Sequence, residues 1–226
     1  MNLYFLVEGK TERKIYPQWI SHFVPTLSRV NFPLEAVDNN YYLISGGGFP
    51  SILDNHLINS IFDVNDSGKY NYLVLVIDTD SLTAEEKAEE VNNFIANNNI
   101  KPKGFELIII PQVVCMESWF LGNRKIYSRN SSNKEAADFA NFYNIAINDP
   151  EVMSKPSDFD GTIGDYHYQY LKTMLAEKNI RYSKSHPKEV GQRYYLDELR
   201  GRVIDQPDKL KSMNFLFSFL AGIECA

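Results

Sequence analysis

The chain has 226 residues, 44% of them hydrophobic and 13% aromatic, which is enough for a sizeable core and excludes an intrinsically disordered protein. Lysine and arginine number 23 against 29 aspartates and glutamates, so the net charge is −6. This negative net charge excludes a protein that binds nucleic acid through an overall positive charge. It still allows a local basic surface and a metal site made of carboxylates.

Four short apolar runs are predicted to form buried strands, at residues 3–7, 41–45, 72–77 and 105–110. Helical patterns separate them, from residue 11 to about 29, from about 49 to 62, and after Thr83 and Glu86, which form a capping box. The polar residues 63–71 are expected to form a loop. Apolar strands that alternate with helices indicate an α/β fold with a Rossmann-like, four-stranded parallel sheet over residues 1–112.

Residues 113–226 show no strong strand pattern and are predicted to form a mainly helical extension packed on the sheet. Helices are expected near residues 116–127, 134–147, 165–178, 187–204 and 208–222, with a long loop over residues 148–164. The last helix carries an apolar stripe at Leu210, Met213, Leu216 or Phe217, Leu220 and Ile223. His167 and His186 are expected at the surface rather than in a metal site.

The cellular compartment can be predicted from the apolar runs and the cysteines. Glu8 and Lys10 interrupt the N-terminal apolar run before it reaches the length of a secretory segment, and the apolar run 213–223 has about half the length of a membrane-spanning helix. Cys115 and Cys225 lie outside any metal-ligand spacing, so free thiols are expected. The sequence therefore predicts a cytoplasmic protein without a membrane segment.

Carboxylates stand where two of the predicted strands end. Glu8 follows the first strand, and Asp78 and Asp80 follow the third. In open parallel sheets, functional groups gather beyond the carboxyl ends of the strands, and a few carboxylates are what Mg²⁺ prefers. The same residues also have purely structural explanations. Asp78 and Asp80 could belong to a capping turn, Glu8 could accept hydrogen bonds from nearby backbone, and Glu12 could be favoured by the helix dipole.

The sequence Val-Glu-Gly-Lys-Thr-Glu at residues 7–12, followed about 70 residues later by Val-Ile-Asp-Thr-Asp at residues 76–80, resembles the motifs of the TOPRIM superfamily. This domain occurs in topoisomerases, bacterial primases, recombination mediators and overcoming-lysogenization-defect nucleases. Its motifs are a glutamate, usually followed by glycine, after the first strand and D-x-D after the third. The resemblance covers about residues 1–112 and implies a TOPRIM-like fold for them.

A second match narrows the resemblance. The sequence Glu-Ser-Trp-Phe-Leu at residues 117–121 is similar to a stretch found in small stand-alone TOPRIM-like bacterial proteins of uncharacterised function. Some of these proteins are encoded beside ATPase genes in defence systems. The match implies Glu117 as a further acid of the metal site, although an acid is also favoured at a helix start. Trp119 and Phe120 are expected in the core rather than as platforms for nucleic-acid bases.

The resemblance implies specific roles for these acids. Glu8 would act as general acid/base or as a metal ligand, and Asp78 and Asp80 would bind Mg²⁺ or Mn²⁺. Glu12 and Glu117 would complete one or two metal positions. The departures from the family are also clear, because the chain shows no topoisomerase cleavage domain, no zinc module of the primase kind and no Walker motif. Any ATPase would therefore be a separate partner protein.

Basic residues offer candidates for contact with nucleic acid. Lys10 lies in the loop between the first strand and its helix, where it could touch a phosphate or be simply solvated. Further positive charge gathers late in the chain and is interleaved with tyrosines. From this region Lys172, Lys184 and Lys188 are predicted to face nucleic acid, and a solvated pair of helices is the structural alternative.

The leading hypothesis is Mg²⁺-dependent hydrolysis of phosphodiester bonds in nucleic acid, as by a nuclease of phage defence or DNA repair. The alternative is a non-catalytic module of the same fold that binds or regulates a partner protein such as an ATPase. A third hypothesis is hydrolysis or transfer on a nucleotide or a small phosphate ester.

Overall fold

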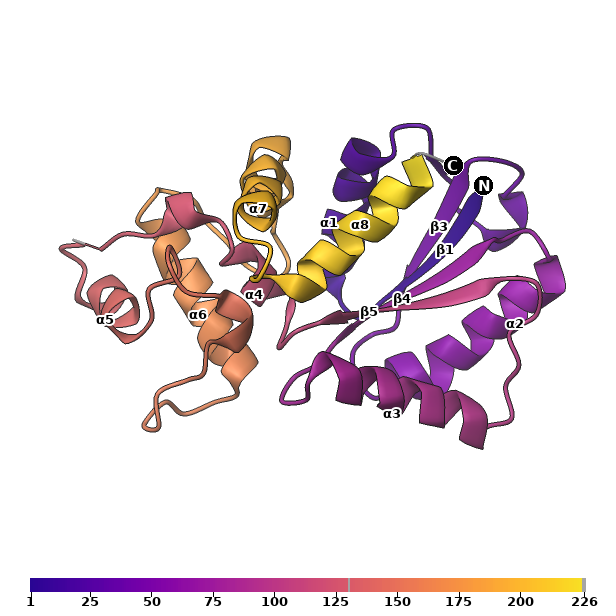
Figure 1. Ribbon diagram of the computed structural model, residues 1–226, viewed down its shortest axis with the longest axis horizontal. Helices are drawn as coiled ribbons and strands as arrows, with labels where there is room; N and C mark the ends of the chain where they lie inside the picture. Colours follow the sequence, from indigo (N-terminus) through magenta and orange to yellow (C-terminus); the bar gives the residue numbers. More distant parts are fainter. Residues whose placement is uncertain (130, 225–226) are drawn as a thin grey trace.

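The computed structural model describes residues 1–129 and 131–224 (Figure 1). Its strands form a single parallel sheet in the order β2-β3-β1-β4-β5. The strands are β1 (Asn2–Val7), β2 (Ser28–Arg29), β3 (Asn40–Ser45), β4 (Tyr72–Asp78) and β5 (Glu106–Gln112). The predicted α/β class with a Rossmann-like parallel sheet is therefore confirmed, but the sheet has five strands rather than four.

The additional strand is the two-residue edge strand β2, which lies where the sequence predicts the end of a helix. Helix α1 spans Lys10–Phe23, six residues shorter than the predicted 11–29 at its C-terminal end. Val24 leaves the helical region at φ −133° and ψ 73°, because the proline that follows it disfavours a helical residue at this position. The chain is then extended and pairs with the start of β3.

Helices cover both faces of the sheet, as Figure 1 shows. Leu3, Phe5 and Val7 of β1 pack into the core shared with α1 and with α8 (Lys211–Glu224), whereas Tyr4 and Leu6 pack into the opposite core. That second core is covered by the π-helical turn Ile52–Leu57, by α2 (Ile58–Ser67) and by α3 (Ala84–Asn97). Since every β1 residue from 2 to 7 is buried, the strand shows no polar face in the sequence.

The helices that follow β3 and β4 differ in how well they were predicted. The expected loop 63–71 is wrong in its first half, because α2 continues to Ser67 and ends at Gly68, which adopts the left-handed conformation at φ 59°. The capping box at the start of α3 is confirmed. Glu86 N–H donates to Thr83 Oγ1 over 3.1 Å, and Thr83 N–H donates to Glu86 Oε2 over 2.8 Å.

The described part of the chain after β5 is mainly helical. It contains α4 (Met116–Phe120), α5 (Lys134–Phe142), α6 (Ile163–Ala176) and α7 (Arg193–Asp205), with the short 3₁₀ turns Arg124–Ile126, Pro150–Val152 and Glu189–Gly191. Trp119 and Phe120 are fully buried, as expected of core residues, and the predicted apolar stripe of α8 is buried along its length. None of the described helices combines the length and apolar character needed to cross a bilayer.

The helix expected near residues 116–127 is wrong beyond Phe120, where α4 ends and the 3₁₀ turn Arg124–Ile126 follows. The surface position predicted for His167 is also wrong. His167 is fully buried rather than at the surface, where its ring nitrogens lie 2.8 Å from Ser118 Oγ and 2.8 Å from the Met153 carbonyl. Burial lowers the pKa of His167 to about 4, so the ring is neutral and serves packing between α4 and α6. Cys115 is a free, buried thiol, and Cys225 lies outside the described residues.

Candidate functional site

The candidate site lies at the carboxyl ends of β1 and β4, where the sheet meets the helical extension (Figure 1). These strands are neighbours in register, with Val7 opposite Val76, so Glu8 and Asp78 follow at the same edge. Asp78 N–H donates to Glu8 Oε2 over 2.9 Å. β1 also marks the point where the sheet order changes direction, since β3 lies on one side and β4 on the other. The strand pairing thus brings these two acids together.

Glu12 joins them from the first turn of α1. Its side chain is only 4% exposed and folds back over the start of the helix. A Cβ atom built on Gly9 would lie 2.6 Å from Glu12 Oε2, so the glycine leaves the space that this carboxylate occupies. The Glu-Gly-x-x-Glu spacing therefore has a steric reason in this chain.

Replacing Gly9 with alanine is expected to displace the Glu12 carboxylate while leaving the fold intact, because the obstructing atom is the end of a flexible side chain. We expect Mg²⁺ affinity of Gly9→Ala to fall by roughly tenfold, the order found when a metal ligand is misoriented. The measurement is calorimetric titration with Mg²⁺ at neutral pH, with urea denaturation to check stability. An unchanged affinity would show that Glu12 takes no part in the metal site.

Glu117 enters the site from α4, and its side chain is 2% exposed. Tyr182 Oη donates to Glu117 Oε1 over 2.8 Å, and Lys184 Nζ lies 3.8 Å from Glu117 Oε2. Both partners come from the segment between α6 and α7. Thr11 Oγ1 at the start of α1 donates to the Lys184 carbonyl over 3.2 Å, which holds this segment beside the acids. The structure therefore places one predicted lysine, Lys184, directly at the acidic site.

The four acids share one electrostatic environment. Burial raises the pKa of Asp78 well above its ordinary value, and the negative charges of Glu12, Glu8 and Glu117 raise it further. Burial and the charges of Glu117 and Glu8 raise the pKa of Glu12 to about 7. The pKa of Glu8 is also raised, chiefly by burial, although the bond from Asp78 N–H opposes this. A cation among these carboxylates would relieve their repulsion.

Several buried polar atoms around the acids have no hydrogen-bond partner among the described residues. They include Asp78 Oδ1, Tyr16 Oη and both polar atoms of the Gln112 side chain. Gln112 pairs with Asp78 in the β4–β5 register. Burial raises the pKa of Tyr16, and the charges of Glu12 and Asp78 raise it further. Since an unpaired buried polar atom costs about 1–3 kcal/mol, this concentration requires an explanation such as a bound ion or water.

These donors fit a hard divalent cation, because they are carboxylate and amide oxygens. The residues that would hold Mg²⁺ are Asp78, Glu12 and Glu117, with Glu8 beside them. Within residues 1–129 and 131–224, no group of three or more His, Cys, Asp and Glu side chains stands in an arrangement that could hold a metal ion as it is. Cation binding would therefore require the carboxylates to turn toward one another.

Asp80 occupies a different position from the other acids. It is exposed, and its φ of 55° lies in the left-handed region, as does the φ of 62° at Val114. Their loops are bonded to each other, since Asp80 N–H donates to the Val114 carbonyl over 3.0 Å and Val114 N–H donates to Thr79 Oγ1 over 2.9 Å. Left-handed backbone at a β-branched residue is strained, and such strain clusters at functional loops. Asp80 thus stands at the rim of the site.

The remaining predicted lysines lie at three separate places. Lys10 is the exposed first residue of α1. Lys188 lines a hollow of about 490 Å³ that also contains Arg13, Lys14, Arg29 and His186, and we name this hollow the α1 groove. Lys172 lines another hollow with Arg181 and Tyr182. Lys172 and Lys188 therefore line different hollows.

Comparison with protein-family models, with curated proteins and with solved structures found no significant match.

The sequence interpretation missed Tyr16 and Gln112, and it placed Tyr182 only among the tyrosines interleaved with the late basic residues. Gln112 carried a usable signal, because a polar residue ending an apolar strand beside the D-x-D strand belongs to the same sheet edge. The roles of Tyr182 and Tyr16 depend on tertiary contacts, and nothing distinguished them among the 14 tyrosines of the chain.

Proposed function

We propose that this protein is a Mg²⁺-dependent phosphodiesterase that cleaves nucleic acid. The observation that carries the proposal is the buried Asp78 beside Glu8, with its unpaired Oδ1 and with Glu12 and Glu117 close enough to raise its pKa. Such a concentration of negative charge is costly in a folded protein without a functional reason. The TOPRIM-like order of the same acids along the chain supports the same activity.

The chemistry follows from the residues. Mg²⁺, when bound, would neutralise charge on the phosphodiester oxygens and lower the pKa of a water molecule. Asp78, Glu12 and Glu117 would hold it. Glu8 lies at the sheet edge, where the Asp78 N–H orients its carboxylate, and it would accept a proton from the attacking water. Lys184, which is 60% exposed, can contact the phosphate and also balance Glu117.

The α1 groove supports nucleic acid as the substrate. Arg13, Arg29 and Lys188 are exposed and form no ion pair within the described residues, and no acid lines this hollow. The groove connects with the site, because the chain that carries Lys184 continues into it and Lys14 Nζ donates to the Ser185 carbonyl. In a protein of net charge −6, an acid-free basic groove next to the carboxylates suits a phosphate backbone.

The test is cleavage of labelled single-stranded and duplex oligonucleotides by the purified protein in Mg²⁺ or Mn²⁺, with EDTA as the control. We expect cleavage only with the metal. Calorimetry in the same buffer measures whether Mg²⁺ or Mn²⁺ binds. A protein that binds neither metal and cuts no substrate would contradict the proposal and favour the non-catalytic module.

The α1 groove makes a separate prediction about salt. For single strands, the slope of log affinity against log salt changes by about 0.7 for each phosphate contact. The double variant Arg13→Gln, Arg29→Gln is therefore expected to reduce this slope by about 1.4 in magnitude. Fluorescence anisotropy with a labelled single strand in EDTA measures the slope without cleavage. The matched control is the double variant Lys101→Gln, Lys103→Gln, at exposed positions before β5. Equal slopes for the two double variants would show that the α1 groove does not bind the single-stranded nucleic acid.

A further inference from the structure

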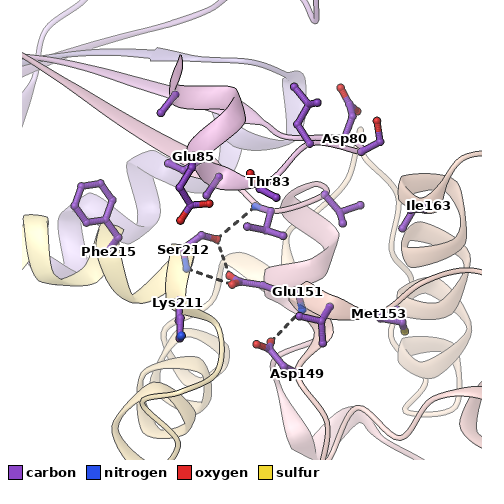
Figure 2. A pocket seen from close by; sticks show the side chains of 18 of the residues that line it. Asp80, Thr83, Glu85, Asp149, Glu151, Met153, Ile163, Lys211, Ser212 and Phe215 are labelled. Atoms are coloured by element: carbon purple, nitrogen blue, oxygen red, sulfur yellow. Dashed lines mark hydrogen bonds between the residues drawn. The ribbon is translucent and has the colours of Figure 1, made fainter. Parts of the chain in front are cut away.

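A second cavity lies beside the site, along the free edge of β5. Its volume is about 850 Å³, and we name it the β5 groove. It opens between the first turn of α3 and the first turns of α8, and the loop at residues 149–154 closes one end. Figure 2 shows Glu85 of α3 facing Ser212 and Phe215 of α8 across this space. The groove is separate from the α1 groove and shares only Asp80 with the predicted metal site.

The lining of the β5 groove is largely apolar. Ile109 and Pro111 come from the edge strand, and Val113 follows it. Two large side chains at its walls are strongly exposed, Phe215 at 49% and Val152 at 73%. Apolar side chains on separate elements that converge on one open hollow are a common mark of an interaction site.

The charged residues of the groove are nearly all acidic. Asp80, Glu85 and Asp208 line it, and their side chains have no hydrogen bond or ion pair within the described residues; Lys211 is the only basic residue among those that line it. The occupant that complements this rim therefore carries positive charge beside apolar groups.

Two further carboxylates give the groove a fixed shape. Glu151 is 8% exposed and accepts a bond of 2.6 Å from Ser212 Oγ, and its other oxygen accepts the Ser212 N–H over 3.3 Å. Asp149 accepts the Glu151 N–H over 3.0 Å (Figure 2) and the Leu210 N–H over 3.3 Å. Trp119 Nε1 donates to the same Ser212 Oγ over 2.8 Å, which ties the wall to the core. The groove is therefore preformed.

The edge strand limits how a peptide can bind. An extended peptide that added to β5 would need N–H groups along the edge, and Pro111 has none. A helix instead binds through side chains at i, i+3, i+4 and i+7, which fit a hollow with apolar walls on two sides. The shape thus favours an amphipathic helix over a strand.

We propose that the β5 groove is a docking site for a basic amphipathic helix of a partner protein. The apolar face of that helix would pack on Ile109, Val113 and Phe215. Its lysines or arginines would form ion pairs with Asp80, Glu85 and Asp208. This inference does not rest on the proposed function, because it needs neither metal nor cleavage.

The test uses the full chain and a labelled 14-residue peptide with leucine at helical spacing and lysine elsewhere. Fluorescence anisotropy is expected to show binding that weakens at least tenfold in Val152→Ser, Phe215→Ser and in Glu85→Gln, Asp208→Asn. These positions are exposed, so the fold should persist, and circular dichroism checks it. Phe62→Ser is the matched control, since Phe62 is 52% exposed on α2 and should leave binding unchanged.

Two altered peptides complete the test. A peptide with glutamate in place of lysine, and one with the same residues at alternating spacing, should each bind at least tenfold more weakly. Equal binding of all three peptides, or no effect of either double variant, would overturn the proposal. Sedimentation that shows a dimer of the free protein, lost in Val152→Ser, Phe215→Ser, would assign the groove to a second copy and overturn it too.

Discussion

Asp78→Asn is expected to lower Mg²⁺-dependent cleavage by roughly a hundredfold or more, because even indirect supports of metal ligands are worth 10–100-fold. The substitution keeps the size of the side chain and removes its charge. The hydrogen bond to Glu8 is donated by the Asp78 backbone, so it survives the substitution. The measurements are the cleavage rate of a labelled oligonucleotide in Mg²⁺ and calorimetric Mg²⁺ affinity.

The same variant should be more stable than the parent in the metal-free state at neutral pH. Asp78 is buried, and the charges of Glu12, Glu8 and Glu117 raise its pKa, so ionising it in the folded protein is unfavourable. A neutral amide removes this repulsion. Loss of activity together with a gain in stability would show that Asp78 has a functional role. Replacing a residue with a structural role would instead lower both activity and stability.

Glu106→Gln is the matched control for Asp78→Asn. Glu106 begins β5 at the opposite end of the sheet and is exposed, so its removal changes the net charge equally without touching the site. We expect normal cleavage and normal Mg²⁺ affinity. Cleavage by Asp78→Asn at the rate of this control would contradict a metal-dependent role for the carboxylate.

The proximity of Glu8 and Asp78 could be predicted from the sequence because it depends on local pattern alone. The apolar run that precedes each acid defines a buried strand, and buried parallel strands end at a common edge. The pairing of Val7 with Val76 places the ends of the two apolar runs side by side, so Glu8 and Asp78 follow at the same edge.

Residues that reach the site from far along the chain could not be predicted in this way. Lys184 lies near Glu117 because its segment is held by Thr11 and Lys14, at sequence separations of 173 and 171 residues. Lys172 has the same basic and aromatic surroundings in the sequence but lines a different hollow. Composition identified a basic region, and only the tertiary contacts distinguish its members.

The edge strand β2 and the buried His167 show two other limits of prediction from the sequence. Two residues are too few to produce a strand pattern, so β2 was hidden in the tail of an amphipathic helix. His167 looked like a surface residue because its neighbours in sequence are polar and aromatic. Its burial depends on partners in α4 and in the loop before α6, namely Ser118 and Met153.

Glu12→Gln is expected to change how stability depends on pH. In the folded protein the Glu12 carboxyl keeps its proton up to a pKa of about 7, whereas the ordinary value is 4.5. Between these values the folded state binds more protons than the unfolded state, so stability falls as pH rises. Below about pH 4.5 the penalty is absent, and above about pH 7 it is complete, on the order of 3 kcal/mol.

The measurement is urea denaturation of the metal-free parent and variant between pH 5 and pH 8. The free energy of unfolding of Glu12→Gln minus that of the parent should grow with pH and reach its plateau near pH 8. Saturating Mg²⁺ should reverse this difference at pH 8, because only the parent presents the Glu12 carboxylate to the cation and binding stabilises the folded state. If the difference in free energy of unfolding does not vary with pH, the pKa of Glu12 is not raised by burial and by the charges of Glu117 and Glu8.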